Sequence, residues 1–230
     1  MFIFSHIPKT AGTALIELLK DNGLKCANYE KGEIANSLKA SPLLELINEG
    51  KIDVVAGHIG YGIHKDIGLN SAEYITTLRD PVERCGSFYD FVCQYPGHTL
   101  QEQVLACGSI ERMMYDLKFP QLDNCMVRMY CGEMNGGDIF KPVAFGEVTK
   151  KHFKAALNNL EKHYIAVGIE EQLNDFAEYL IFKGIIKNNN LKRVRVTSKR
   201  TKISQADKEA IEKYNKWDLE LFGIIQRKWQ

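Results

Sequence analysis

The first twenty residues constrain the fold most, because they predict a buried strand, a tight polar turn and a helix in direct succession. Residues 2–4 are an apolar run, residues 5–13 (SHIPKTAGT) are mostly small or polar, and residues 14–20 have a helical pattern. The first backbone N–H groups of a helix have no partner within it, and the helix dipole favours negative charge there. The sequence therefore predicts an anion site where this turn meets the helix.

The composition of the turn suits a phosphate group. Lys9 supplies a mobile positive charge, Thr10 and Thr13 supply hydroxyl donors, Pro8 stiffens the chain, and Gly12 lets the backbone approach an anion closely. The common nucleoside-triphosphate loop has the order G-x-x-x-x-G-K-[ST], whereas Lys9 precedes Gly12 by three residues. Read alone, the stretch is also compatible with an ordinary strand–turn–helix carrying a solvated lysine.

This turn resembles the 5′-phosphosulfate loop of sulfotransferases that use 3′-phosphoadenosine 5′-phosphosulfate (PAPS). The similarity is greatest to the branch that contains the heparan sulfate 2-O- and 6-O-sulfotransferases and bacterial relatives. It implies that Lys9 contacts the bridging or leaving oxygen, as one of two catalytic residues. It also implies that the loop holds the 5′-phosphosulfate through Pro8, Lys9, Thr10, Ala11, Gly12, Thr13 and Ala14.

A second motif lies at residues 77–89 (TLRDPVERCGSFY), after a predicted strand at residues 74–78. Asp80 fits a helix N-cap, Pro81 fits the first helical position, and Glu83 completes a capping box. The motif resembles the family's 3′-phosphate site, which implies that Arg79 and Ser87 bind the 3′-phosphate. Guanidinium groups do bind phosphate bidentately. The alternative is that Arg79 pairs with Asp80 or Glu83 and that Ser87 is a buried helical residue.

His58 is the candidate general base, because it follows a predicted β-branched strand at residues 52–56 within a glycine-rich loop. An unperturbed histidine has a pKa of about 6.5, which suits removal of a hydroxyl proton near neutrality. The Gly57-His58 pair resembles the segment that carries the base in enzymes like heparan sulfate 2-O-sulfotransferase. His64 is the rival candidate, and either histidine could instead be a loop residue bonded to backbone.

Residues 183–206 contain eight basic residues and no acidic one. Such a stretch is usually a solvated face. The family resemblance instead implies a basic loop over the nucleotide, for which Lys199, Arg200 and Thr201 are the nearest match. The same stretch could hold an anionic acceptor. Nucleic acid is disfavoured, since the stretch has no aromatic residue on which a base could stack.

Predicted strands at residues 24–27, 52–56, 74–78 and 164–168 alternate with predicted helices. This alternation indicates an α/β fold of three layers, in which helices flank a mainly parallel sheet. By resemblance it is the P-loop-like fold of sulfotransferases. Ligands of such sheets bind beyond the carboxyl ends of the strands. The loops after residues 4, 56 and 78 should therefore form one site.

The chain has 230 residues and a formal net charge of +1, which fits a single domain, residues 1–230, with no general attraction to nucleic acid or membranes. No apolar run approaches the roughly 18 residues of a membrane span, and no targeting segment is visible, so we expect a cytoplasmic protein. The six cysteines lack metal-site spacing, so neither a metal nor a disulfide framework is expected.

Together, the two motifs predict anion sites, and their resemblance to the family implies a PAPS-dependent sulfotransferase that acts on an acceptor hydroxyl and releases 3′,5′-adenosine bisphosphate (PAP). By family resemblance a carbohydrate hydroxyl, such as that of an anionic glycan, comes first, while a lipid, a small metabolite and protein tyrosine stay open as acceptors. One alternative is a nucleotide or metabolite kinase on a similar sheet. Another is a non-catalytic module that binds a nucleotide or a polyanion. The sequence leaves the acceptor and the oligomeric state open.

Overall fold

The computed structural model describes residues 1–28, 42–132, 143–192 and 200–229. Its centre is a five-stranded sheet with the order β2-β3-β1-β4-β5. Every pairing between neighbouring strands is parallel, so the predicted α/β architecture with a parallel sheet is confirmed. The strands are β1 (Phe2–Ser5), β2 (Cys26–Asn28), β3 (Val54–Gly57), β4 (Glu73–Leu78) and β5 (Tyr164–Ile169).

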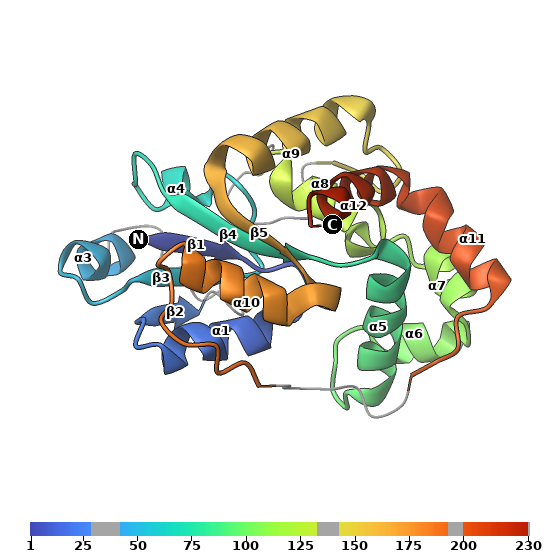
Figure 1. Cartoon of the computed structure of the whole chain (residues 1–230). Helices are drawn as coiled ribbons and strands as arrows, with labels where there is room; N and C mark the ends of the chain where they lie inside the picture. Colours follow the sequence, from blue (N-terminus) through green and yellow to red (C-terminus); the bar gives the residue numbers. More distant parts are fainter. Residues whose placement is uncertain (29–41, 133–142, 193–199, 230) are drawn as a thin grey trace.

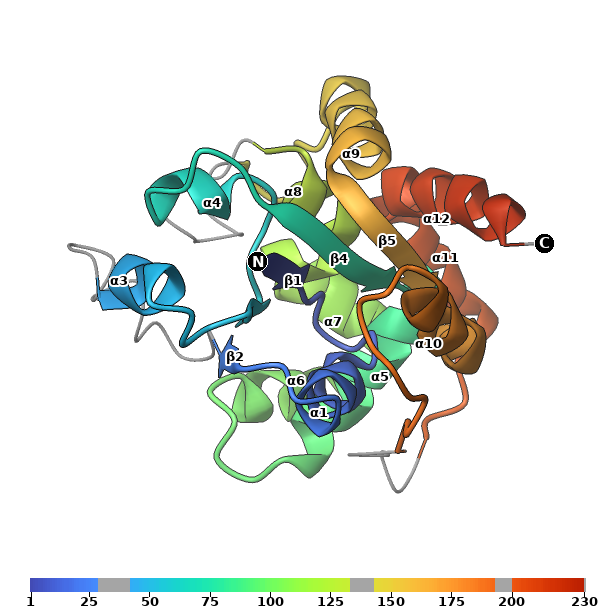
Figure 2. The ribbon, with the colours of Figure 1, turned by 60° about the vertical axis from the view of Figure 1, so that its left-hand side comes forward.

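Helices cover both faces of the sheet (Figures 1 and 2). On one face lie α1 (Gly12–Asp21) and α10 (Leu173–Phe182), and on the other lie α8 (Cys125–Tyr130), α9 (Lys150–His163) and α12 (Lys216–Lys228). Because strand side chains alternate between faces, neighbours in β1 enter different cores. Ile3 packs in the cluster that includes α9 and α12, whereas Phe4 packs with α1 and α10.

A third core lies to one side of the sheet, among helices that follow β4 or come late in the chain (Figure 1). It is formed by α5 (Pro81–Gln94), α6 (Gln101–Cys107), α7 (Ile110–Asp116) and α11 (Gln205–Tyr214). The shorter elements are α3 (Pro42–Asn48), α4 (Ile63–Asp66), η1 (Pro120–Leu122) and η2 (Glu170–Gln172). No helix in the described part of the chain is both long and apolar enough to cross a bilayer.

The predicted start of α5 is confirmed in part. Asp80 is the N-cap and its carboxylate accepts the N–H groups of Val82 and Glu83, with Pro81 at the first turn. The capping box is wrong, because the Asp80 N–H donates to Glu171 Oε1 at 3.2 Å and not to Glu83. The sequence also predicts helical patterning over residues 33–49, broken at residues 41–42, and a turn at residues 132–137; of these, residues 33–41 and 133–137 lie outside the described residues.

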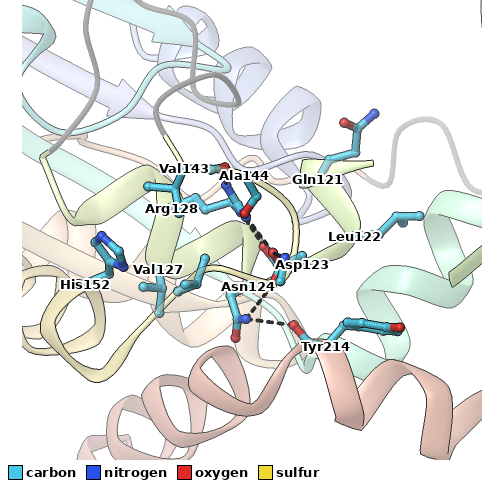
Figure 3. Close-up of polar contacts among 12 residues, drawn as sticks. Gln121, Leu122, Asp123, Asn124, Val127, Arg128, Val143, Ala144, His152 and Tyr214 are labelled. Carbon is cyan, nitrogen blue, oxygen red and sulfur yellow. Dashed lines mark hydrogen bonds and ion pairs between the residues drawn. The ribbon is translucent and has the colours of Figure 1, made fainter. Parts of the chain in front are cut away.

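A buried polar network joins α8 to the segment before α9 (Figure 3). Arg128 forms an ion pair of 2.5 Å with Asp123, and its guanidinium also donates to the Val143 and Ala144 carbonyls. The side-chain amide of Asn124 donates to the Tyr214 carbonyl at the end of α11. Because each of these charges has a partner, the network can remain buried at little net cost.

Asp218 anchors α12 to the start of α8. Its fully buried carboxylate accepts the N–H groups of Met126 and Val127 at 2.9 and 2.8 Å. The carboxylate thereby satisfies two of the helix N–H groups that have no partner within a first turn. Burial raises the pKa of Asp218 to about 6, while the nearby Arg84 guanidinium opposes that rise.

We predict that Asp218→Ala lowers the free energy of unfolding by about 3 kcal/mol, because it leaves two buried N–H groups without an acceptor. Urea denaturation followed by circular dichroism measures the change. Asp116→Ala is the matched control, since Asp116 pairs with Arg112 at 3.5 Å on the surface and should contribute less than about 1 kcal/mol. Equal losses in the two variants would contradict the assignment.

Candidate active site

The loops that follow β1, β3 and β4 open into one cleft with a volume of about 1,020 Å³. Its lining includes Lys9 from the first loop with Gly12 at the start of α1, His58 from the second loop, and Arg79 from the third with Ser87 from α5. The pairing of β1 with both β3 and β4 brings these loops together, as is usual at the carboxyl edge of a parallel sheet. Both predicted phosphate motifs thus face the same cleft.

The first turn has an unusual backbone. Lys9 and Ala11 both adopt the left-handed conformation, with φ of 72° and 61°, although neither is glycine. Such a conformation costs roughly 1–2 kcal/mol for a residue with a side chain, and such strain clusters at functional sites. Ala11 is also the N-cap of α1, and no side-chain hydrogen bond caps that end. The turn therefore presents the start of α1 to the cleft.

Gly12 is required for a reason that the sequence did not reveal. A Cβ at this position would lie 2.0 Å from Cδ2 of His6, so the imidazole ring fills the space that a side chain would need. His6 is buried, lies parallel to the Phe4 ring, and has its ring centre 4.7 Å from that of His58. His6 was not among the predicted site residues, although its place directly after β1 was the available signal.

Thr10 does not face the cleft as the phosphate-loop prediction assumed. It is fully buried, and its hydroxyl donates to the Ile7 carbonyl at 3.0 Å. The Thr77 hydroxyl on β4 donates to the Thr10 carbonyl at 2.7 Å. Thr10 thus fixes the turn to the sheet, because its short side chain is used inside the turn. The remaining predicted loop residues line the cleft, namely Pro8, Lys9, Ala11, Gly12, Thr13 and Ala14.

Lys9 reaches across the cleft to α5. Its ammonium group lies 4.2 Å from the centre of the Phe91 ring, within the range of a cation–π contact. Its carbonyl accepts a hydrogen bond from Nη1 of Arg79 at 3.3 Å. The turn after β1 and the strand end that carries Arg79 are therefore in direct contact.

Arg79 lies almost buried at the end of β4, among carboxylates. Its Nε is 3.5 Å from Glu170 Oε2, and its Nη2 is 3.9 Å from Glu83 Oε2. Pairing with Glu83 was an alternative to a role in binding, but the structure combines an ion pair with a place in the cleft lining. Glu170, from η2, was not predicted as a site residue.

The end of the basic stretch is fastened to α5. Asp90 is a buried carboxylate that accepts the Thr201 N–H, with its two oxygens at 3.1 and 3.2 Å. Gly86 leaves room for Ile203, since a Cβ there would lie 2.9 Å from Ile203 Cδ1. These contacts place Arg200 in the cleft lining.

A small hollow beside the cleft is bordered by Arg79, Ser87, Arg200 and Thr201, among others. The hollow thus joins the predicted 3′-phosphate residues to two of the three predicted basic-loop residues. The third, Lys199, lies outside the described residues.

The two candidate histidines occupy different environments. His58 is half-buried and lines the cleft. His64 lies in α4, where its Nδ1 is 2.7 Å from the Tyr74 hydroxyl, and that oxygen also accepts the N–H groups of Gly62 and His64. With two donors already on its oxygen, the Tyr74 hydroxyl donates its proton to an unprotonated His64 Nδ1. His64 therefore holds the loop on the sheet and does not line the cleft.

Metal ligands do not gather at this site. Among the described residues, no group of three or more His, Cys, Asp or Glu side chains is placed to hold a metal ion.

We predict that Gly12→Ala destabilises the protein by about 1–3 kcal/mol, because the new methyl group overlaps the His6 ring. Adding His6→Ala should recover part of that loss, which a double-mutant cycle of urea denaturations would show. Gly223→Ala is the control, since a Cβ there meets only Arg227 Nη1 at 3.7 Å and favours the helix. Strictly additive effects of the His6 and Gly12 changes would refute the contact.

We also predict that His64 makes stability depend on pH. Burial lowers the pKa of His64 below 6.5, and Lys65 adds to the effect. The unfolded chain then takes up the proton more readily, so the free energy of unfolding falls as pH drops through 6.5. Urea denaturation at pH 7.5 and 5.5 should show a smaller loss in His64→Gln than in the wild type. An equal loss in both would exclude His64 as the cause.

The known proteins that are similar to this chain are sulfotransferases, as are the proteins that its motifs resemble. Heparin sulfate O-sulfotransferase of Drosophila melanogaster is 22% identical over 95% of this chain and 68% of its own. Heparan sulfate 2-O-sulfotransferase 1 of Mus musculus is 25% identical over 78% of this chain, but the alignment spans only about half of the mouse protein, 53%. No family model matches the sequence.

Among solved structures, mouse sulfotransferase SULT7A1 complexed with PAP aligns with 95% of this chain and 64% of its own. The TM-score is 0.43 and the identity 12%, which is too low to support an inference, so the fold assignment rests on the sheet itself. The chain is thus similar in sequence to heparan sulfate O-sulfotransferases, the branch that its two phosphate motifs resemble.

Proposed function

We propose that this chain is a sulfotransferase that moves the sulfonate of PAPS to an acceptor hydroxyl and releases PAP. The observation that carries the proposal is the shared cleft, which contains the turn at Lys9, the Arg79–Ser87 pair and His58. The sulfotransferase homologues support the same activity. A nucleotide with phosphates at both its 3′ and 5′ positions needs two anion sites within one cavity, and this cleft offers both.

The residues present fit such a nucleotide. The turn at residues 8–14 would hold the 5′-phosphosulfate against the start of α1, where a helix favours negative charge. Arg79 and Ser87 would hold the 3′-phosphate, with Arg200 at the edge of the same hollow. The cleft volume of about 1,020 Å³ is at the upper end of the range for small-molecule sites, which leaves room for an acceptor beside a nucleotide.

When bound, PAPS would supply the sulfonate to be transferred. His58 would accept the proton of the acceptor hydroxyl, a task that suits an imidazole near neutral pH. Lys9 would leave the Phe91 ring and donate to the phosphate oxygen that gains charge as the sulfonate departs. By analogy with phosphoryl transfer, catalysis would rest on positioning and on electrostatic stabilisation.

We propose a carbohydrate hydroxyl as the acceptor, because both curated relatives are named for heparin or heparan sulfate. The cleft offers rings as well as charges for binding it, since Phe88, Phe91 and His98 line one side. A polyanionic chain would also meet Lys192 and Arg200 at the rim.

Isothermal titration calorimetry with PAP and with ATP tests the nucleotide part of the proposal. PAP should bind at least tenfold more tightly than ATP without Mg²⁺, and Arg79→Ala should remove most of that preference, because the 3′-phosphate loses its guanidinium. Tighter binding of ATP, with Mg²⁺-dependent turnover, would point to a kinase instead. Tight PAP binding without transfer to any hydroxyl in a glycan and metabolite screen would indicate a binding module.

Transfer of ³⁵S-labelled sulfonate from PAPS tests the catalytic residues. We expect Lys9→Ala and His58→Ala each to lower kcat by about 10²–10³-fold. The control is His64→Gln assayed at pH 7.5, which alters a histidine of the same loop outside the cleft. Full turnover by His58→Ala would refute the role of this histidine as base.

A further inference from the structure

The carboxylates around Arg79 are unexpected in a pocket for a phosphate. We propose that Glu170 competes with the 3′-phosphate for Arg79 and thereby limits the affinity for both the donor and its product. This inference rests on the proposed function, since it concerns the nucleotide that the cleft would bind. It makes Glu170 a specificity-determining residue that faces the nucleotide site without being needed for the transfer step.

The carboxylates and a phosphate would compete because they occupy the same edge of the Arg79 guanidinium. Nη1 of Arg79 donates to the Lys9 carbonyl at 3.3 Å, so that nitrogen is used to hold the turn. Nε faces Glu170 at 3.5 Å and Nη2 faces Glu83 at 3.9 Å. The Nε–Nη2 edge is one of the two forks with which arginine binds phosphate bidentately. A 3′-phosphate on that edge must displace the carboxylates.

The carboxylates hold Arg79 by charge and do not satisfy its donors. Both ion-pair distances exceed the 2.7–3.2 Å usual for hydrogen bonds to nitrogen donors. Nε of Arg79 is buried, and no hydrogen-bond acceptor in the described part of the chain meets it. A phosphate oxygen could approach Nε to full hydrogen-bond distance, so the phosphate would bind Arg79 in place of the carboxylates. Its net affinity would be lower than at an arginine without carboxylate neighbours, because the existing ion pairs must first be broken.

Of the carboxylates near Arg79, Glu170 should compete most strongly with the 3′-phosphate. It is closer to Arg79 than Glu83, and its side chain is 27% exposed, against 53% for Glu83, so water screens it less. Glu171 is engaged elsewhere, since its Oε1 accepts the Asp80 N–H.

Calorimetry with two nucleotides that differ only in the 3′-phosphate tests this inference. We expect Glu170→Gln to bind PAP about three- to tenfold more tightly than the wild type, and 5′-AMP with unchanged affinity. Glu83→Gln should shift PAP binding in the same direction by less. Asp175→Asn is the matched control, because Asp175 lines the cleft without an ion pair to Arg79 and should leave the ratio of the two affinities unchanged.

Turnover gives a second readout that a merely structural role would not move. Because PAP and PAPS share the 3′-phosphate, Glu170→Gln should lower the KM for PAPS and lower the inhibition constant of PAP by the same factor. Wild-type thermal stability should be retained, since glutamine has nearly the same shape and Glu170 is partly exposed.

Two results would overturn the inference. Weaker PAP binding by Glu170→Gln would mean that the carboxylate positions Arg79 for the phosphate. Equal tightening for PAP and 5′-AMP would mean a general effect of charge on the cleft. A failure of the proposed function is recognised separately, from the wild type alone, if it binds 5′-AMP as tightly as PAP.

Discussion

The place of β1 at the centre of the sheet is the constraint on which the site depends. Because β1 pairs in parallel with both β3 and β4, the three strands end at one edge of the sheet. The loops that follow them therefore lie side by side at that edge. Short connections between the loops complete the arrangement. The Ser5 hydroxyl donates to the Ile59 carbonyl, and Arg79 donates to the Lys9 carbonyl. The sheet thus brings the three loops close together, and a few side-chain hydrogen bonds fix their positions relative to one another.

Much of this arrangement could be predicted from the sequence, because it follows from local patterns. Apolar runs with the period of a strand located four of the five strands closely, and Asp80-Pro81 located the start of α5. Loops at strand ends then had to share an edge. The motif residues Lys9, His58 and Arg79 could be placed in one cleft by that argument alone.

The remaining details depend on tertiary contacts that no local pattern encodes. The left-handed backbone at Lys9 and Ala11 is imposed by its surroundings, because neither residue favours it by itself. The requirement for glycine at position 12 comes from a ring six residues earlier. Glu171 bonds the Asp80 N–H from a point 91 residues away along the chain, and this contact replaced the predicted local capping box. The approach of Glu170 to Arg79 from η2 likewise follows from no local pattern, whereas the pairing of Arg79 with Glu83 was one of the alternatives that the sequence left open.

The attachment of Thr201 and Ile203 to α5 has a consequence for how such a chain can vary. Asp90 and Gly86 lie on the same helix as Ser87, so the backbone next to Arg200 is held beside that helix by the contacts of Thr201 and Ile203. The position of Arg200 beside α5 therefore does not depend on the length of the stretch between α10 and residue 200. A change in the length of that stretch would leave the contacts of Asp90 and Gly86 with residues 201 and 203 as they are.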